Sequence, residues 1–119
     1  MPELDKVFAA LTGIMAPYVP TLDCKKDDAS ELYLDTRHIQ KNKKPLFFGA
    51  VQVKKSHVSF HLMPVYFKPE LCQDMSNALK ARMQGKSCFN FRKIDEPLFS
   101  ELALLTKQGY ASYKKQGFV

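Results

Sequence analysis

The sequence has no tryptophan, three cysteines and no long apolar run. A membrane-spanning helix needs roughly 20 consecutive apolar residues, and no stretch comes near that length. Glu3 and Asp5 stand where a secretory signal peptide would carry basic residues, so we expect a cytoplasmic protein. The cysteines (Cys24, Cys72 and Cys88) are odd in number and lack disulfide or metal-binding spacing, which predicts free thiols.

Motifs for metal binding and catalysis are also missing. His57 and His61 lie four residues apart on one predicted strand, about 13 Å at about 3.3 Å per residue, and therefore cannot share a metal ion. Gly85-Lys86-Ser87 resembles the end of a phosphate-binding loop, but position 80 is lysine, and a helix precedes where a strand should. We therefore expect no metal, no cofactor and no enzymatic activity.

The composition is that of one folded domain over residues 1–119. Apolar residues make up 45% and charged residues 25% of the chain, which is ordinary for a globular protein. Eighteen Lys and Arg against twelve Asp and Glu give a net charge of +6. This excess favours anionic partners (nucleic acid, a phosphorylated metabolite or an acidic protein), although it can equally serve solubility alone.

Hydrophobic periodicity predicts an α+β domain. We expect about five mainly antiparallel strands and three helices in the order α-ββ-ββ-α-β-α. The predicted elements are a helix over 3–18, a hairpin over 22–36, a hairpin over 46–63, a helix over 69–84 ending at Gly85, a strand over 86–92, and a helix after its N-cap Asp95.

The second hairpin allows a residue-level prediction. A two-residue turn at Lys55-Ser56 pairs Ala50 with His61 and Gln52 with Ser59. Alternation then places Phe47 on the core side and Phe48 on the opposite side.

The opposite, mixed side of the sheet combines cations with aromatic rings. Arg and Lys can hold an anion while aromatic faces stack on a ligand, so this side is a candidate binding surface. The residues predicted to bind are Tyr33, Arg37, Phe48, His57, His61, Lys86, Cys88, Asn90 and Arg92. The alternative is that these residues form the solvated side of an antiparallel sheet and bind nothing.

Three further possibilities stay open. Cys88, near Lys86 and Arg92, could be a nucleophile if His57 or His61 served as its base. A nucleic-acid partner is possible but not favoured. The edge strand and Phe118 leave both a monomer and a homodimer possible.

Three segments resemble a known family: Lys44-Pro45-Leu46-Phe47-Phe48-Gly49-Ala50-Val51, His57-Val58-Ser59-Phe60-His61 and Gly85-Lys86-Ser87-Cys88-Phe89-Asn90-Phe91. From about residue 30 to 115 the chain is similar to the YdhG-like family, domain of unknown function 1801. The resemblance implies a compact α+β domain. One branch of that family is described as frataxin-like iron chaperones that bind iron through surface carboxylates, so iron delivery is the alternative function.

The sequence departs from what that branch requires. Iron delivery needs clustered oxygen ligands, whereas the adjacent acidic pairs here are Asp27-Asp28 and Asp95-Glu96 in a chain of net charge +6. The leading hypothesis is therefore a small binding domain for an anionic ligand or partner.

Overall fold

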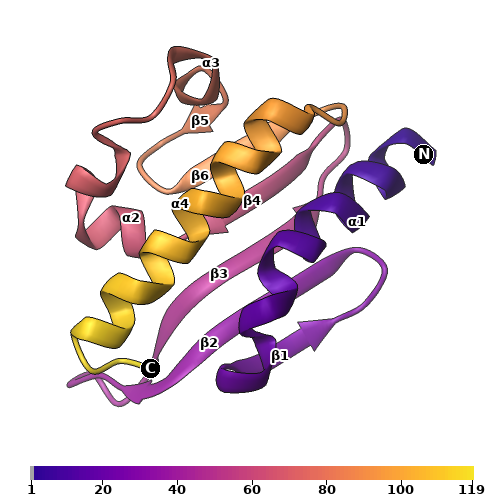
Figure 1. The fold of residues 1–119 in the computed structure, drawn as a ribbon. Helices are drawn as coiled ribbons and strands as arrows, with labels where there is room; N and C mark the ends of the chain where they lie inside the picture. Colours follow the sequence, from indigo (N-terminus) through magenta and orange to yellow (C-terminus); the bar gives the residue numbers. More distant parts are fainter. Residues whose placement is uncertain (1) are drawn as a thin grey trace.

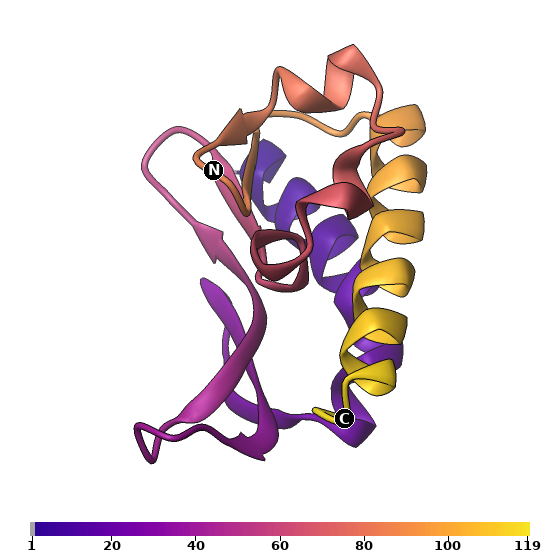
Figure 2. The ribbon, with the colours of Figure 1, turned by 90° about the vertical axis from the view of Figure 1, so that its left-hand side faces the viewer.

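The computed structural model describes residues 2–119 as two layers: a six-stranded antiparallel sheet and, on one of its faces, the helices α1 and α4 (Figures 1 and 2). The sheet order is β1-β2-β3-β4-β6-β5. The elements are α1 (Pro2–Met15), η1 (Ala16–Thr21), β1 (Asp23–Asp27), β2 (Glu31–Ile39), β3 (Pro45–Val53), β4 (Val58–Leu62), α2 (Pro64–Phe67), η2 (Pro69–Cys72), α3 (Asn77–Lys80), β5 (Met83–Gln84), β6 (Cys88–Phe91) and α4 (Glu96–Lys115).

The two long helices form where apolar residues recur at helical spacing. Leu4, Val7, Leu11 and Met15 of α1 are all buried, which is the predicted stripe. α4 begins as predicted at Asp95, whose Oδ1 accepts a hydrogen bond from the Leu98 amide at 3.3 Å. Neither these nor any other helix within residues 2–119 is long and apolar enough to cross a membrane.

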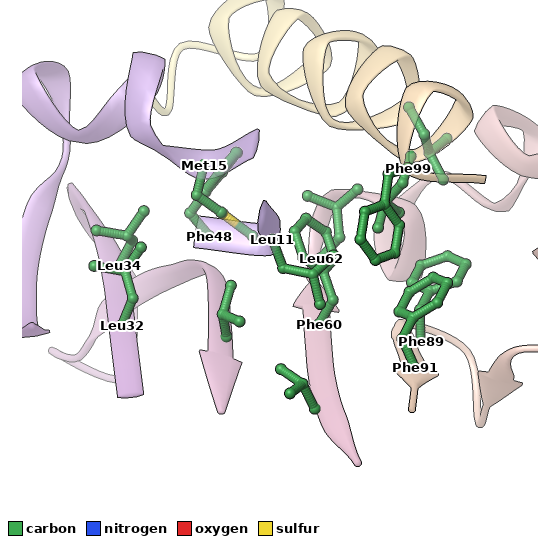
Figure 3. Packing of buried hydrophobic residues seen from close by; sticks show 14 of the residues in the cluster. Leu11, Met15, Leu32, Leu34, Phe48, Phe60, Leu62, Phe89, Phe91 and Phe99 are labelled. Atoms are coloured by element: carbon green, nitrogen blue, oxygen red, sulfur yellow. The ribbon is translucent and has the colours of Figure 1, made fainter. Parts of the chain in front are cut away.

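The core lies between the two helices and the sheet. Its side chains come from α1, α4 and the central strands, and Figure 3 shows several of them interdigitating. The rings of Phe91 and Phe99 meet edge to face with centroids 4.9 Å apart, which joins β6 to α4. This packing fixes β6 and the residues that follow it.

The register of the predicted hairpin over 46–63 is confirmed. Ala50 pairs with His61 and Gln52 with Ser59, and the Lys54 amide donates to the His57 carbonyl at 2.8 Å across the turn. The predicted α+β class with a mainly antiparallel sheet is also confirmed.

The predicted position of Phe48 on the mixed side is wrong, because β3 contains a bulge. Leu34 pairs with Gly49, yet the next residue of β2, Asp35, pairs with Phe47. The extra residue in β3 turns Phe48 into the core, where it is fully buried against aromatic rings of η1 and α4. Phe47 correspondingly lies on the opposite side and stacks on Tyr33 with centroids 4.8 Å apart.

The single helix predicted over 69–84 is also wrong. This part of the chain forms η2, α3 and the edge strand β5. The Ser76 hydroxyl accepts a hydrogen bond from the Leu79 amide and starts α3 afresh, while Met83 and Gln84 pair with β6. Gly85, with φ of +76°, lies in the β5–β6 turn and is not a helix C-cap. The described residues thus have six strands and four α-helices in place of the predicted five and three.

Candidate anion-binding cavity

Within residues 2–119, one face of the sheet has no helix over it (Figure 2). We call this the uncovered face; it carries Glu31, Tyr33, Asp35, Phe47, Ala50, Gln52, Ser59, His61, Cys88 and Asn90. Several of these side chains are nonetheless shielded from solvent, since Asp35 is 7% and Ser59 4% exposed. Desolvation raises the pKa of Asp35. The face is therefore ordered and only partly hydrated.

A first row of side chains crosses the strands from β1 to β4. Lys26 Nζ lies 3.2 Å from a Glu31 oxygen, Gln52 Nε2 donates to Glu31 Oε2 at 2.5 Å, and Gln52 Oε1 lies 3.2 Å from His61 Nε2. Burial, helped by the charge of Lys54, lowers the pKa of His61. Because a lowered pKa keeps the ring neutral near pH 7, His61 can donate Nε2–H to Gln52 without a buried charge.

A second row leads from β4 to the sheet edge. Ser59 Oγ donates to Asn90 Oδ1 at 2.8 Å, and Asn90 Nδ2 donates to Gln84 Oε1 at 2.8 Å. Cys88 joins this row through Sγ, 3.5 Å from Asn90 Oδ1. Burial raises the pKa of the Cys88 thiol, which is opposite to the lowered pKa that favours a nucleophilic thiolate.

The second row ends at a cavity of about 370 Å³, which we call the arginine cavity. It is lined by His57, Ala81, Arg82, Met83, Gln84, Asn90 and Arg92. A smaller cavity of about 230 Å³ shares Arg82 and Arg92 and adds Phe91, Lys93 and Asp95. Arg82 and Arg92 therefore line both spaces, and Asp95 is the acidic residue of the smaller one.

The two arginines reach the cavity from different elements. Arg82 follows α3; its amide donates to the Leu79 carbonyl at 2.9 Å, and its carbonyl accepts from the Asn90 amide at 2.8 Å. Arg92 comes directly after β6, next to the buried Phe91. Throughout residues 2–119, the basic residues that form ion pairs within 4 Å are Lys25 and Lys26, so neither guanidinium is in an ion pair with a carboxylate.

The structure separates the predicted site residues. His57, Asn90 and Arg92 meet in the arginine cavity. Tyr33, His61 and Cys88 lie on the uncovered face but do not line that cavity. Lys86 lies in the β5–β6 turn, with Nζ 6.0 Å from the centroid of the Tyr66 ring. Arg37, toward the end of β2, lines a different cavity beside Phe118, and Phe48 belongs to the core.

Arg82 and Gln84 were missed because their segment was predicted to be helical. A usable signal exists: Gly85 followed by Lys86 and Ser87 suits the turn of a hairpin as well as a helix end. Placing that glycine in a turn would have paired Gln84 with Cys88, as the structure shows, and brought Arg82 beside the sheet edge.

Metal ligands are not gathered in the described part of the chain. No group of three or more His, Cys, Asp or Glu side chains there is arranged to hold a metal ion.

Comparisons with known proteins give no information about the family or function of this chain. No family model matches the chain, and neither a curated protein nor a solved structure matches it. The resemblance to the YdhG-like family accordingly stays a prediction.

Proposed function

We propose that this protein is a small binding domain that holds an anionic ligand, or an anionic group of a partner, in the arginine cavity. The observation that carries the proposal is the pair of guanidinium groups, Arg82 and Arg92, which border one cavity with no carboxylate within ion-pair distance among the described residues. Like charges brought together lose some of their mutual repulsion when an anion lies between them. A phosphate or carboxylate group is the natural occupant.

The chemistry of the lining supports this assignment. A guanidinium presents N–H donors in a planar fork that matches phosphate and carboxylate oxygens, and such charge-assisted hydrogen bonds are about twice as strong as neutral ones. His57 adds an imidazole ring to the lining, and the hydrogen bonds from Ser59 to Asn90 and from Asn90 to Gln84 hold two of the lining side chains in place. Because Asn90 and Gln84 are already hydrogen-bonded to each other, less ordering is required when the anion binds.

The test is a titration of the protein with inorganic phosphate and pyrophosphate, followed by calorimetry and by amide NMR shifts. We expect shifts centred on residues 81–84 and 90–92. Arg92→Ala and Arg82→Ala should each weaken binding about tenfold or more, the loss expected for a charge-assisted hydrogen bond of about 1.5–3 kcal/mol.

Arg37→Ala is the matched control. Arg37 is an exposed arginine that lines another cavity, and its removal changes the net charge by the same amount. Equal losses in Arg37→Ala and Arg92→Ala would mean that net charge alone attracts the anion, and would overturn the proposal. An oligonucleotide that binds with a steep fall in affinity with salt would identify the anionic partner as nucleic acid.

A further inference from the structure

A second cavity lies away from the arginine cavity, between the β2–β3 loop, α2 and the segment after α4. It measures about 450 Å³ and is lined by His38, Gln40, Lys41, Asn42, Leu46, Phe67, Gln116 and Phe118. We call it the aromatic cavity. The two cavities share no lining residue, and Figure 1 shows the end of α4 far from β5 and β6. Its volume is within the range of small-molecule sites.

Phe67, Phe118 and His38 contribute rings to its wall. Phe118 is held in place because Gly117, at φ of +84°, reverses the chain and the Phe118 amide donates to the Tyr113 carbonyl at 2.9 Å. The Phe118 ring also lies 4.7 Å from the His38 ring, centroid to centroid. Phe67 is 49% exposed, although a residue of this kind is normally buried. A flat apolar ligand would cover it.

The polar groups of the cavity suit an acid. Lys41 is the charged residue of the lining, and no acidic side chain is among the described residues that line it. Gln40 and Gln116 both donate through Nε2 to neighbouring oxygens of the chain. The hydrogen bonds of these two side chains are made through Nε2, which leaves each Oε1 without a donor among residues 2–119.

We propose that the aromatic cavity binds a planar aromatic acid, with its ring against Phe67 and Phe118 and its carboxylate toward Lys41. Stacking on the two rings supplies the binding energy, while the lysine selects the anionic form. The glutamine oxygens accept from a ring N–H where the ligand has one. This site is additional to the arginine cavity and does not depend on it.

The experiment uses indole-3-carboxylate as the probe and the neutral indole-3-carboxamide as its counterpart, measured by calorimetry and amide NMR shifts on the full chain. We expect Phe67→Ala to weaken indole-3-carboxylate binding about tenfold, within the range measured for loss of one stacking contact. Leu104→Ala is the matched control, because Leu104 is a large apolar residue that is 55% exposed and does not line the cavity. It should retain the wild-type affinity.

Lys41→Ala separates the role of charge from that of stacking. It should weaken binding of the carboxylate about threefold, as an exposed ion pair does, and leave the carboxamide unchanged. Lys44→Ala, in the same loop but outside the lining, is the control. Equal affinity of Phe67→Ala and wild type, equal affinity for carboxylate and carboxamide, or no shift of residues 38–46 and 116–118 at millimolar probe would each overturn the proposal.

Discussion

At the scale of single residues, Gly49 of β3 lies directly against Met15 of α1. A Cβ atom at this position would lie 2.5 Å from Met15 Cε and 2.7 Å from the His61 carbonyl oxygen. The methionine end can swing away, but the carbonyl is fixed by sheet pairing. Gly49→Ala should therefore lower the free energy of unfolding by about 1–3 kcal/mol in chemical denaturation.

Gly13→Ala is the matched control for that measurement. Gly13 lies within α1, and a Cβ atom added there would meet nothing within 4 Å. Alanine at this position should therefore stabilise the protein by about 0.5–1 kcal/mol through helix propensity. Loss of stability in both variants would contradict a specific close contact at Gly49.

His61 gives a residue-level prediction about pH. Because burial lowers its pKa below the ordinary 6.5, the unfolded chain binds a proton at this ring more readily than the folded one. The contribution of His61 to stability is thus fully present above about pH 6.5 and is lost as the pH falls through the folded-state pKa. Denaturation of wild type and His61→Gln at pH 7.5 and 5 should show a smaller acid loss in the variant. An NMR titration that finds the folded ring titrating at or above 6.5 would contradict this.

At the scale of elements, the sequence predicts best where its periodicity is clean. The stripe of α1, the capped start of α4 and the register of the β3–β4 hairpin all followed from alternation or from a capping residue. Alternation alone does not reveal the bulge beside Gly49, because Phe47 and Phe48 are both apolar and either can face the core; the glycine inside the strand is the signal that could have indicated it. Close approach of Met15, a contact distant in sequence, explains the glycine there.

The prediction of one helix over 69–84 was wrong for a different reason. The apolar residues of that segment fit a helical stripe, but of these Leu79 alone is fully buried in the structure. A stripe without a surface to bury it gives little helical stability, so the Ser76 cap and edge pairing with β6 decide the local structure. The candidate site was therefore predictable only in part. His57, Asn90 and Arg92 come from regions whose structure was predicted correctly, whereas Arg82 lies in the segment that was predicted wrongly.

Glu101 of α4 attaches that segment to the rest of the molecule. Its carboxylate accepts hydrogen bonds from the Ser76 amide at 2.7 Å and the Ser76 hydroxyl at 2.6 Å. Glu101→Ala should increase hydrogen exchange at Leu79, Lys80 and Ala81, whose amides bond within the turn that Ser76 begins. Because Arg82 follows directly, phosphate affinity should fall severalfold as well. Glu101→Gln keeps an acceptor and should have the smaller effect, whereas unchanged exchange in Glu101→Ala would disprove the attachment.

At the scale of the whole molecule, few of the basic side chains form ion pairs with acidic ones. The net charge is +6, and the ion pairs found in residues 2–119 are confined to the β1–β2 hairpin. The arginine cavity adjoins β5 and β6, while the aromatic cavity adjoins the opposite end of α4. The arginine cavity is lined by two arginines and the aromatic cavity by one lysine, and none of the three forms an ion pair within residues 2–119, so the excess of unpaired basic side chains is common to both proposals.

This charge distribution predicts two separable effects of salt on stability. Sodium chloride should raise the melting temperature modestly by screening self-repulsion, and should do so in every arginine variant. Sodium phosphate at the same ionic strength should add a larger increase by occupying the arginine cavity, since a ligand at about 100 times its dissociation constant contributes about 2.7 kcal/mol. Phosphate also stabilises proteins in general by exclusion from their surface, and Arg92→Ala, which lacks an arginine of the cavity, shows the size of that effect. The additional increase should persist in Arg37→Ala and disappear in Arg92→Ala. If it persists in both, phosphate acts through exclusion and screening alone, and the arginine cavity is not its site.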